Sequence, residues 1–316
     1  GGGTPVVSRS VSLDSQLRRS LAGSAGRRKY PIEAVMDTGI DFAFPNTATI
    51  PIQHNGGHPM CDTVEPDYIG WDFVNDQNDP YDDDRHNKHG SRIAAIISEA
   101  MGNEVRILPL KVISSSGVGT LFDIFCGFEY VLSNRLPEKP TVINASWGFY
   151  SVNENTLLTN YIRQLYNQHI WLVNAAGNRG DINQNGTNVS LDNKIRFPAC
   201  YSDLHFNVLT STTTKDNPFD AVENFSSTYV NAGVQGDQDG GFPESLNNNP
   251  ANPKIIGSSY ATPYASAFVA INYRKPFDKV TRSSLVELFP NSDEIPDLSE
   301  EIENGLITIP SAPLGL

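Results

Sequence analysis

The chain has 316 residues, 39% of them hydrophobic and 19% charged, with a formal net charge of −13. This composition excludes a disordered chain and supplies enough apolar side chains for a large core. The negative charge repels phosphate backbones, so we expect no nucleic acid among the partners. No apolar run of about 18 residues occurs, and the sequence therefore predicts no membrane span.

The N-terminal residues 1–29 are rich in Ser, Gly and Arg, which is typical of a loosely packed arm. We therefore divide the chain into an N-terminal arm, 1–29, and one folded domain, 30–316. The sequence has no basic segment followed by an apolar one at its start, so we expect no signal peptide in it.

Apolar runs and helical spacing alternate along the domain. Short apolar runs predict buried strands at 31–36, 105–112, 141–146, 170–174 and 206–210. Apolar residues three and four positions apart predict helices after His89, across 121–132, across 157–166 and after Ser259. This alternation predicts an α/β fold with a mostly parallel central sheet and helices on both faces.

Two polar stretches and three cysteines complete the pattern. Residues 75–88 and 231–252 are rich in Asp, Asn, Gly and Pro, which predicts surface loops. Cys61, Cys126 and Cys200 are too few for a disulfide framework and lack metal-ligand spacing, although one disulfide remains open. Cys126 falls on the apolar side of a predicted helix, where a buried free thiol is expected.

Four short segments lie at the predicted ends of strands or starts of helices. They are Asp37-Thr38-Gly39, His89-Gly90-Ser91, Ala175-Ala176-Gly177-Asn178 and Gly257-Ser258-Ser259-Tyr260-Ala261-Thr262-Pro263. In open α/β sheets, binding and reaction sites gather at the carboxyl ends of the strands. The sequence therefore predicts that these segments meet at one site.

In their order along the chain, these segments resemble the subtilisin family of serine proteases, the subtilases. Asn144-Ala145-Ser146-Trp147-Gly148 is similar to the strand that binds substrate in that family, and the resemblance covers about residues 31–310. It implies a subtilisin-like fold and a serine endopeptidase. It also implies a peptide or protein substrate, a possible pro-segment or inhibitor as partner, and a secreted or periplasmic location.

The resemblance assigns catalytic roles to four residues. Ser259 would be the nucleophile, His89 the base that removes its proton, and Asp37 the residue that orients and stabilises His89. Asn178, with the backbone N–H of Ser259 at a helix start, would stabilise the oxyanion. Any one of these residues alone has an ordinary structural explanation, such as a helix N-cap for Ser259. Together and in order they favour catalysis.

The same resemblance assigns the substrate-binding residues. An extended peptide would lie along Ser146, Trp147 and Gly148. Ala175, Ala176 and Gly177 would form one wall of the S1 pocket, which receives the side chain of P1, the residue whose carbonyl is attacked. The sequence departs from the family pattern at Ser91, Arg92, Trp147 and Ser258. Arg92 would lower the pKa of His89 if its cation faced the site.

Two other functions remain open on the same residues. A peptide ligase or macrocyclase would use an amine instead of water at the acyl-enzyme. A non-catalytic peptide-binding module would have the same fold with a blocked or unassembled site.

The acidic loop 72–84 has two interpretations. Its Asp and Asn oxygens suit Ca²⁺, and a related segment binds calcium in some members of the family. The alternative is a solvated acidic loop without a metal. We expect no cofactor to be required for the reaction and assign no metal site.

Overall fold

The computed structural model describes residues 30–43, 70–102, 104–133, 136, 138–182, 186–215, 220–243, 254–272, 301–303 and 308–309. The proposed arm, 1–29, and Cys61 lie outside these residues. The strands are β1 (Ile32–Asp37), β2 (Trp71–Asp72), β3 (Arg106–Lys111), β4 (Val142–Ala145), β5 (Phe149–Tyr150), β6 (Trp171–Ala175), β7 (Arg196–Phe197), β8 (Val208–Thr214), β9 (Ala232–Gln235), β10 (Gly241–Pro243), β11 (Lys254–Ile256) and β12 (Thr308–Ile309). The helices are α2 (His89–Ala100), α3 (Leu121–Leu132), α4 (Thr156–Asn167), α5 (Ser258–Asn272) and a short 3₁₀ helix, Ala199–Tyr201.

A twisted eight-stranded sheet forms the centre, in the order β12-β9-β8-β6-β4-β1-β3-β2. All pairings within it are parallel. After β1 the chain forms β2 and then β3 on one side of it, and it then crosses to β4 on the other side. The strand order therefore reverses at β1, and such a reversal opens a crevice at the carboxyl ends of the strands.

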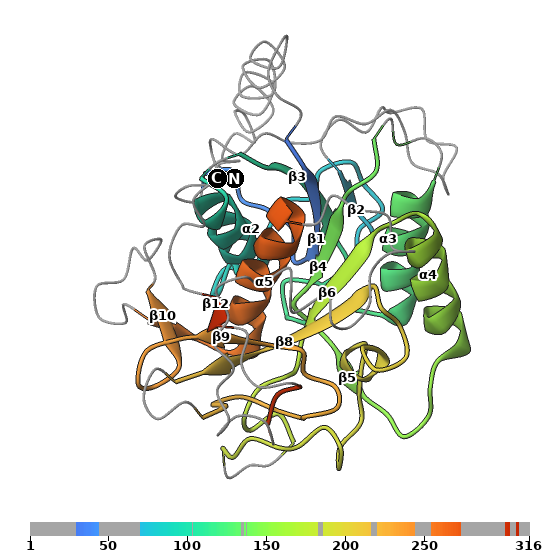
Figure 1. The fold of residues 1–316 in the computed structure, drawn as a ribbon. Helices are drawn as coiled ribbons and strands as arrows, with labels where there is room; N and C mark the ends of the chain where they lie inside the picture. The colour runs from blue at the N-terminus through green and yellow to red at the C-terminus, as the bar shows by residue number, and fades with distance from the viewer. Residues whose placement is uncertain are drawn as a thin grey trace, which may run out of the picture.

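The helices cover both faces of this sheet (Figure 1), as predicted: α2 and α5 lie on one face and α3 and α4 on the other. Side chains alternate along each strand, so that Ala34 and Met36 face α3 and α4 whereas Val35 faces α2 and α5. Continuous apolar strands follow from this double burial. No helix among the described residues is long and apolar enough to cross a membrane.

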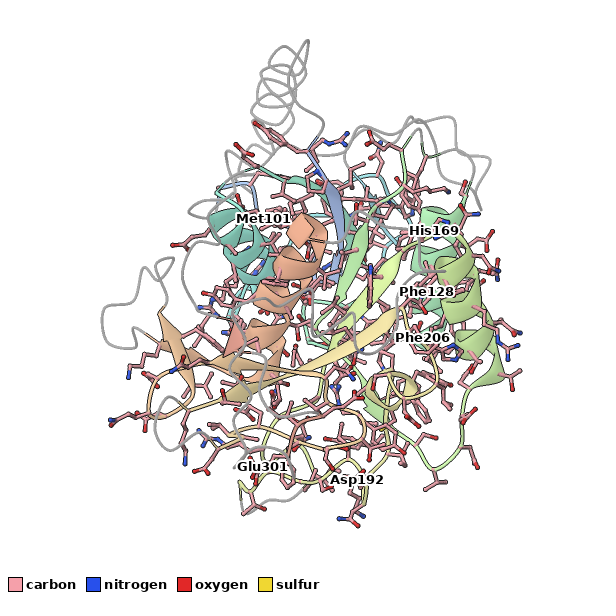
Figure 2. The ribbon with its side chains drawn as sticks, viewed as in Figure 1. Met101, Phe128, His169, Asp192, Phe206 and Glu301 are labelled. Atoms are coloured by element: carbon pink, nitrogen blue, oxygen red, sulfur yellow. The ribbon has the colours of Figure 1, made fainter. Side chains whose placement is uncertain are left out.

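Two separate cores result. Met101, just after α2, and Phe128, within α3, belong to the cores on opposite faces of the sheet (Figure 2), and both are fully buried. Cys126 and Cys200 are buried free thiols. The free thiol expected at Cys126 is therefore confirmed.

The prediction of a surface loop across 231–252 is wrong for part of its length. Residues 232–235 form β9, an inner strand that pairs with β8 on one side and β12 on the other. This strand is short and contains Gly233, so its only apolar side chains are Ala232 and Val234, both fully buried. Its strand character comes from its two neighbours in the sheet, because four residues carry little propensity of their own.

Candidate active site

The predicted site residues meet at the carboxyl edge of the sheet, where the strand order reverses. Asp37 is the last residue of β1, Ser146 follows β4, and Asn178 follows β6. His89 opens α2 and Ser259 lies in the first turn of α5, the two helices that share one face. Segments separated by more than 200 residues are thereby brought to one place.

Asp37 and His89 are directly hydrogen-bonded. Asp37 is fully buried, and its Oδ1 lies 2.8 Å from His89 Nδ1. The same oxygen accepts the Thr38 backbone N–H at 2.8 Å, while the Gly90 backbone N–H donates to Thr38 Oγ1 at 2.9 Å. The Gly90 bond therefore adds a second link between the start of α2 and the end of β1, and the Thr38 N–H helps to orient the Asp37 carboxylate.

Gly90 makes this close approach possible. A Cβ atom at this position would lie 2.4 Å from the carbonyl oxygen of Gly39. Helix α2 therefore packs its first turn directly on the backbone of the segment that follows Asp37, which glycine alone permits without displacement.

The pKa of His89 is raised above its ordinary value. Burial lowers this pKa, but the negative charge and hydrogen bond of Asp37 raise it and prevail, with smaller contributions from Asp82 and Asp84. The net shift is upward, so Arg92 does not hold the pKa of His89 below its ordinary value. The Arg92 guanidinium donates to Asn87 Oδ1 at the beginning of α2, so carboxylates dominate the electrostatics around the imidazole.

Ser259 is linked to the predicted substrate strand in both directions. Its hydroxyl donates to the Ser146 carbonyl at 3.1 Å, and the Ser146 hydroxyl donates to the Ser259 carbonyl at 2.9 Å. The second bond is available because Pro263 lacks the N–H that would otherwise bond the Ser259 carbonyl four residues back. Proline inside α5 thus frees an acceptor, the Ser259 carbonyl, next to the predicted nucleophile.

The Ser259 hydroxyl faces Ser146 and not the His89 ring. His89 packs instead against the next side chain, with 5.5 Å between the ring centroids of His89 and Tyr260. For Ser259 to give its proton to His89, as the resemblance implies, its hydroxyl would have to release the Ser146 carbonyl. Hydrogen bonds of this kind are commonly long or misaligned in the free enzyme and tighten only when substrate binds.

The side chain of Asn178 has a fixed orientation. Its Oδ1 accepts the Ser258 backbone N–H at 2.8 Å and the Ser258 hydroxyl at 3.0 Å. A backbone N–H can only donate, so the atom facing Ser258 is the oxygen. The Nδ2 amide therefore points away from Ser258 as a donor, next to the start of α5, where the helix dipole also favours negative charge.

The predicted substrate residues differ in what they present. Trp147 is buried in the core, and its indole N–H donates to the Met36 carbonyl at 3.0 Å, so this residue can offer substrate its backbone rather than its ring. Ala175 and Ala176 are fully buried. Gly148 and Gly177 lie on either side of one side chain, Arg196.

Arg196 is the residue of this site that the sequence did not reveal. It begins β7, which pairs antiparallel with β5, and so follows no family motif or spacing. The pairing of Tyr150 with Arg196 brings the guanidinium beneath the predicted substrate segments. A single arginine within a two-residue strand gives no local signal of this placement.

In the acidic loop, the Asp72 carboxylate is surrounded by hydrogen-bond donors. All four contacts of the Asp72 carboxylate are donors: the backbone N–H groups of Val74 and Asn75 and the side-chain amides of Asn75 and Gln77. Within the described residues, no group of three or more His, Cys, Asp or Glu side chains could hold a metal ion. Calcium binding by loop 72–84 stays one of two interpretations, and no metal is assigned to it.

Comparison with known proteins agrees with this geometry. The model of the subtilase family matches residues 31–293. Subtilisin-like protease 1 of Plasmodium vivax is 26% identical over 299 residues, covering 86% of this chain and 45% of the relative. Minor extracellular protease Epr of Bacillus subtilis (strain 168) is 28% identical over 199 residues, covering 60% of this chain and 27% of the relative. The chain thus spans less than half the length of either.

A solved structure supports the fold independently. A cold adapted subtilisin-like serine proteinase superposes with a TM-score of 0.57 at 21% sequence identity, covering 90% of this chain and 89% of that one. The family model spans most of the chain and includes every one of the predicted site residues. The chain therefore belongs to the subtilase family.

Proposed function

We propose that the protein is a serine endopeptidase in which Asp37, His89 and Ser259 form the catalytic triad. The observation that carries this proposal is the 2.8 Å hydrogen bond between Asp37 and His89 at the edge of the sheet where α5 presents Ser259. Membership of the subtilase family supports the same reaction class.

In the first half of the reaction, Ser259 Oγ attacks the peptide carbonyl and transfers its proton to His89 Nε2. Asp37 keeps the proton on Nδ1 and stabilises the imidazolium as it forms. The oxyanion accepts hydrogen bonds from Asn178 Nδ2 and the Ser259 backbone N–H. The carbon–nitrogen bond then breaks, and His89 gives its proton to the leaving amine.

In the second half, water attacks the acyl-enzyme. His89 removes a proton from that water and returns one to Ser259 Oγ, releasing the carboxylic acid and restoring the free enzyme. A ligase would differ only in the nucleophile that enters at this step. No contact among the described residues favours an amine over water, so hydrolysis is the function we propose.

The peptide would lie extended beside Ser146, Trp147 and Gly148 and add backbone hydrogen bonds to this segment. Gly177 would face it from the other side. A relative whose name describes it as extracellular supports a location outside the cytoplasm. A pro-segment or protein inhibitor would occupy the same groove as substrate.

A fluorophosphonate probe, which reacts with activated serines, tests the proposal. We expect the native protein to be labelled and the Ser259→Ala variant to remain unlabelled, because only an activated hydroxyl reacts. Ser227→Ala is the matched control, since Ser227 is exposed and is not among the residues proposed for the site, so this variant should be labelled like the native protein. Equal labelling of Ser259→Ala and native protein would contradict the assignment. No labelling of the folded native protein would favour the non-catalytic binding module.

Product mass separates hydrolysis from ligation. When a peptide is incubated with the native protein, hydrolysis gives two fragments whose summed mass exceeds that of the peptide by one water. A ligase would give a cyclic or joined product without that added water.

A further inference from the structure

A buried guanidinium lies between the two segments that would flank the substrate. Arg196 is 6% exposed. A Cβ atom at Gly148 would lie 2.3 Å from Arg196 Nη1, and one at Gly177 would lie 2.7 Å from Arg196 Nε. The arginine side chain therefore packs against the backbone of both segments, and only glycine at both positions leaves room for it.

The guanidinium is held in place by neutral groups. Arg196 Nη1 donates to the carbonyl of Ala175, at the end of β6. The cation also lies over the ring of Tyr150, 5.8 Å from its centroid. A carbonyl and a phenol ring fix its position but leave its charge without a counter-ion.

Among the described residues, no carboxylate forms an ion pair with Arg196, and its buried Nε makes no hydrogen bond. Burial lowers the pKa of Arg196, opposed by Tyr150, Asp181 and Cys200. Asp181 is exposed, and its carboxylate accepts hydrogen bonds from the Asn178 N–H at 2.9 Å and the Tyr150 hydroxyl at 3.4 Å. A buried, unpaired cation costs folding free energy, so a ligand anion would relieve a real cost.

The position of the nucleophile determines which substrate side chain approaches Arg196. The attacked carbonyl carbon must lie at Ser259 Oγ, with its oxygen toward Asn178. The side chain of that residue, P1, branches one bond away and would point toward the segments of Gly148 and Gly177. Arg196 packs against both glycines and would therefore be the charged group nearest to that side chain.

We propose that Arg196 is the specificity-determining residue of the S1 pocket and selects substrates with aspartate or glutamate at P1. This inference rests on the proposed peptidase function. The anionic carboxylate of P1 accepts hydrogen bonds from the guanidinium, including its unpartnered Nε, and supplies the missing counter-ion. Lysine or arginine at P1 is disfavoured because it would bring a second cation into the same space.

The test is kcat/KM for one fluorogenic peptide sequence with Asp, Asn, Glu, Gln, Leu or Lys at P1. We expect Asp over Asn and Glu over Gln by roughly 30-fold or more, the range for a close buried charge pair. Each pair differs in charge at nearly constant shape. Equal rates within both pairs would overturn the proposal.

Variants at Arg196 assign the preference to this residue. Arg196→Gln should abolish the preference for Asp over Asn, whereas Arg196→Lys should retain part of it because the cation remains. Arg163→Gln is the matched control, since Arg163 is exposed on α4 and the same chemical change there should leave the ratio unchanged. If Arg196→Gln does not fold, the native Asp/Asn ratio and Arg196→Lys still decide the question. An undiminished preference in a folded Arg196→Gln variant would contradict the proposal.

Labelling by the fluorophosphonate probe, measured on the same samples, keeps the two proposals distinct. Peptide aldehydes with Asp, Asn or Leu at P1 are added as competitors, so that occupancy is measured even without turnover. Labelling that is blocked equally by all three aldehydes would overturn the role of Arg196 while leaving the peptidase function intact. Loss of labelling in every sample would contradict the peptidase function itself.

Discussion

His89 combines two opposing effects in one side chain. Burial disfavours the imidazolium, while the carboxylate 2.8 Å away favours it, and the carboxylate prevails. The proposed reaction needs both outcomes in turn. The ring must be neutral to accept the proton of Ser259, and the imidazolium must be stabilised once that proton has moved.

The raised pKa of His89 predicts the acid limb of activity. Only neutral His89 can act as a base, so activity falls as the pH decreases through the pKa of His89. We expect the midpoint of this limb in kcat/KM to lie above 6.5, the ordinary histidine value. The measurement is kcat/KM across pH with a peptide whose P1 residue does not titrate, so that the pH dependence comes from the enzyme and not from the substrate. A midpoint below 6.5 would show that burial, and not Asp37, governs the imidazole.

The residues that carry the proposed chemistry could be predicted because each lies in a short segment with its own pattern. Asp37, His89, Asn178 and Ser259 are each followed or preceded by glycine or small residues that the geometry requires. Arg196 has no such pattern. Its role depends on the antiparallel pairing of β5 and β7, and a contact between strands this short cannot be read from either one alone.

At the level of elements, the junction between β1 and α2 governs whether the proposed Asp37–His89 pair assembles. The two elements meet through Gly90, whose Cα lies against the Gly39 carbonyl. Sequence periodicity identified both elements, but their close packing could be established only from the structure.

Gly90→Ala tests this junction. Glycine-to-alanine replacement within a helix normally stabilises by about 1 kcal/mol. Here we expect the opposite sign, a loss of about 1–3 kcal/mol in the free energy of unfolding, because the added Cβ would clash with backbone. Urea denaturation measures this change. We also expect a lower kcat, since relieving the clash moves His89 away from Asp37.

Gly102→Ala, just after α2, serves as the control. A Cβ there would meet no atom within 4 Å, although its φ of +57° carries some strain. It should destabilise modestly and leave kcat unchanged. Equal effects of the two substitutions on kcat would show that the contact at Gly90 has no special role.

Short inner strands mark the limit of sequence prediction at this scale. Strands β1, β3, β4 and β6 lie in apolar runs, which indicate strands buried on both faces of the sheet. All four strands were predicted. Strand β9 has four residues and lies in a segment rich in Gly, Asn and Asp. It forms because β8 and β12 offer backbone hydrogen bonds on either side. The sequence of β9 itself does not contain this information.

At the scale of the whole molecule, Glu33 is the described carboxyl group whose raised pKa most clearly opposes stability. Glu33 of β1 is fully buried, and neither carboxyl oxygen makes a hydrogen bond of normal geometry, although the Ser266 hydroxyl approaches it. Burial raises the pKa of Glu33 to about 8, and the nearby Ser266 opposes this rise. The short apolar run at 31–36 predicted a buried strand but not a protonated acid within it.

Glu33 predicts a stability that falls as pH rises. In the unfolded chain the carboxyl loses its proton near 4.5, whereas the folded protein retains it up to about 8. The unfolded state therefore binds fewer protons across this interval, and the free energy of unfolding decreases throughout it. Above pH 8 the loss levels off at a few kcal/mol.

Glu33→Gln should remove this decrease in the free energy of unfolding with rising pH. We expect the variant to resemble the native protein near pH 5 and to exceed it in stability near pH 9, as measured by urea denaturation at both values. Glu154→Gln is the control, because Glu154 is exposed and its replacement should leave the difference between the two pH values unchanged. A native-like pH dependence in Glu33→Gln would show that Glu33 ionises normally.

The paired hydrogen bonds between Ser146 and Ser259 have a consequence for fidelity. Each residue donates its hydroxyl to the carbonyl of the other, and Pro263 keeps one of those carbonyls available. A displacement of Ser146, in the proposed substrate-binding segment, would thus also displace Ser259, the proposed nucleophile. In the proposed reaction, a peptide that binds out of register and displaces Ser146 would also displace the backbone of Ser259 through the Ser146 hydroxyl, and so would react more slowly as well as bind more weakly.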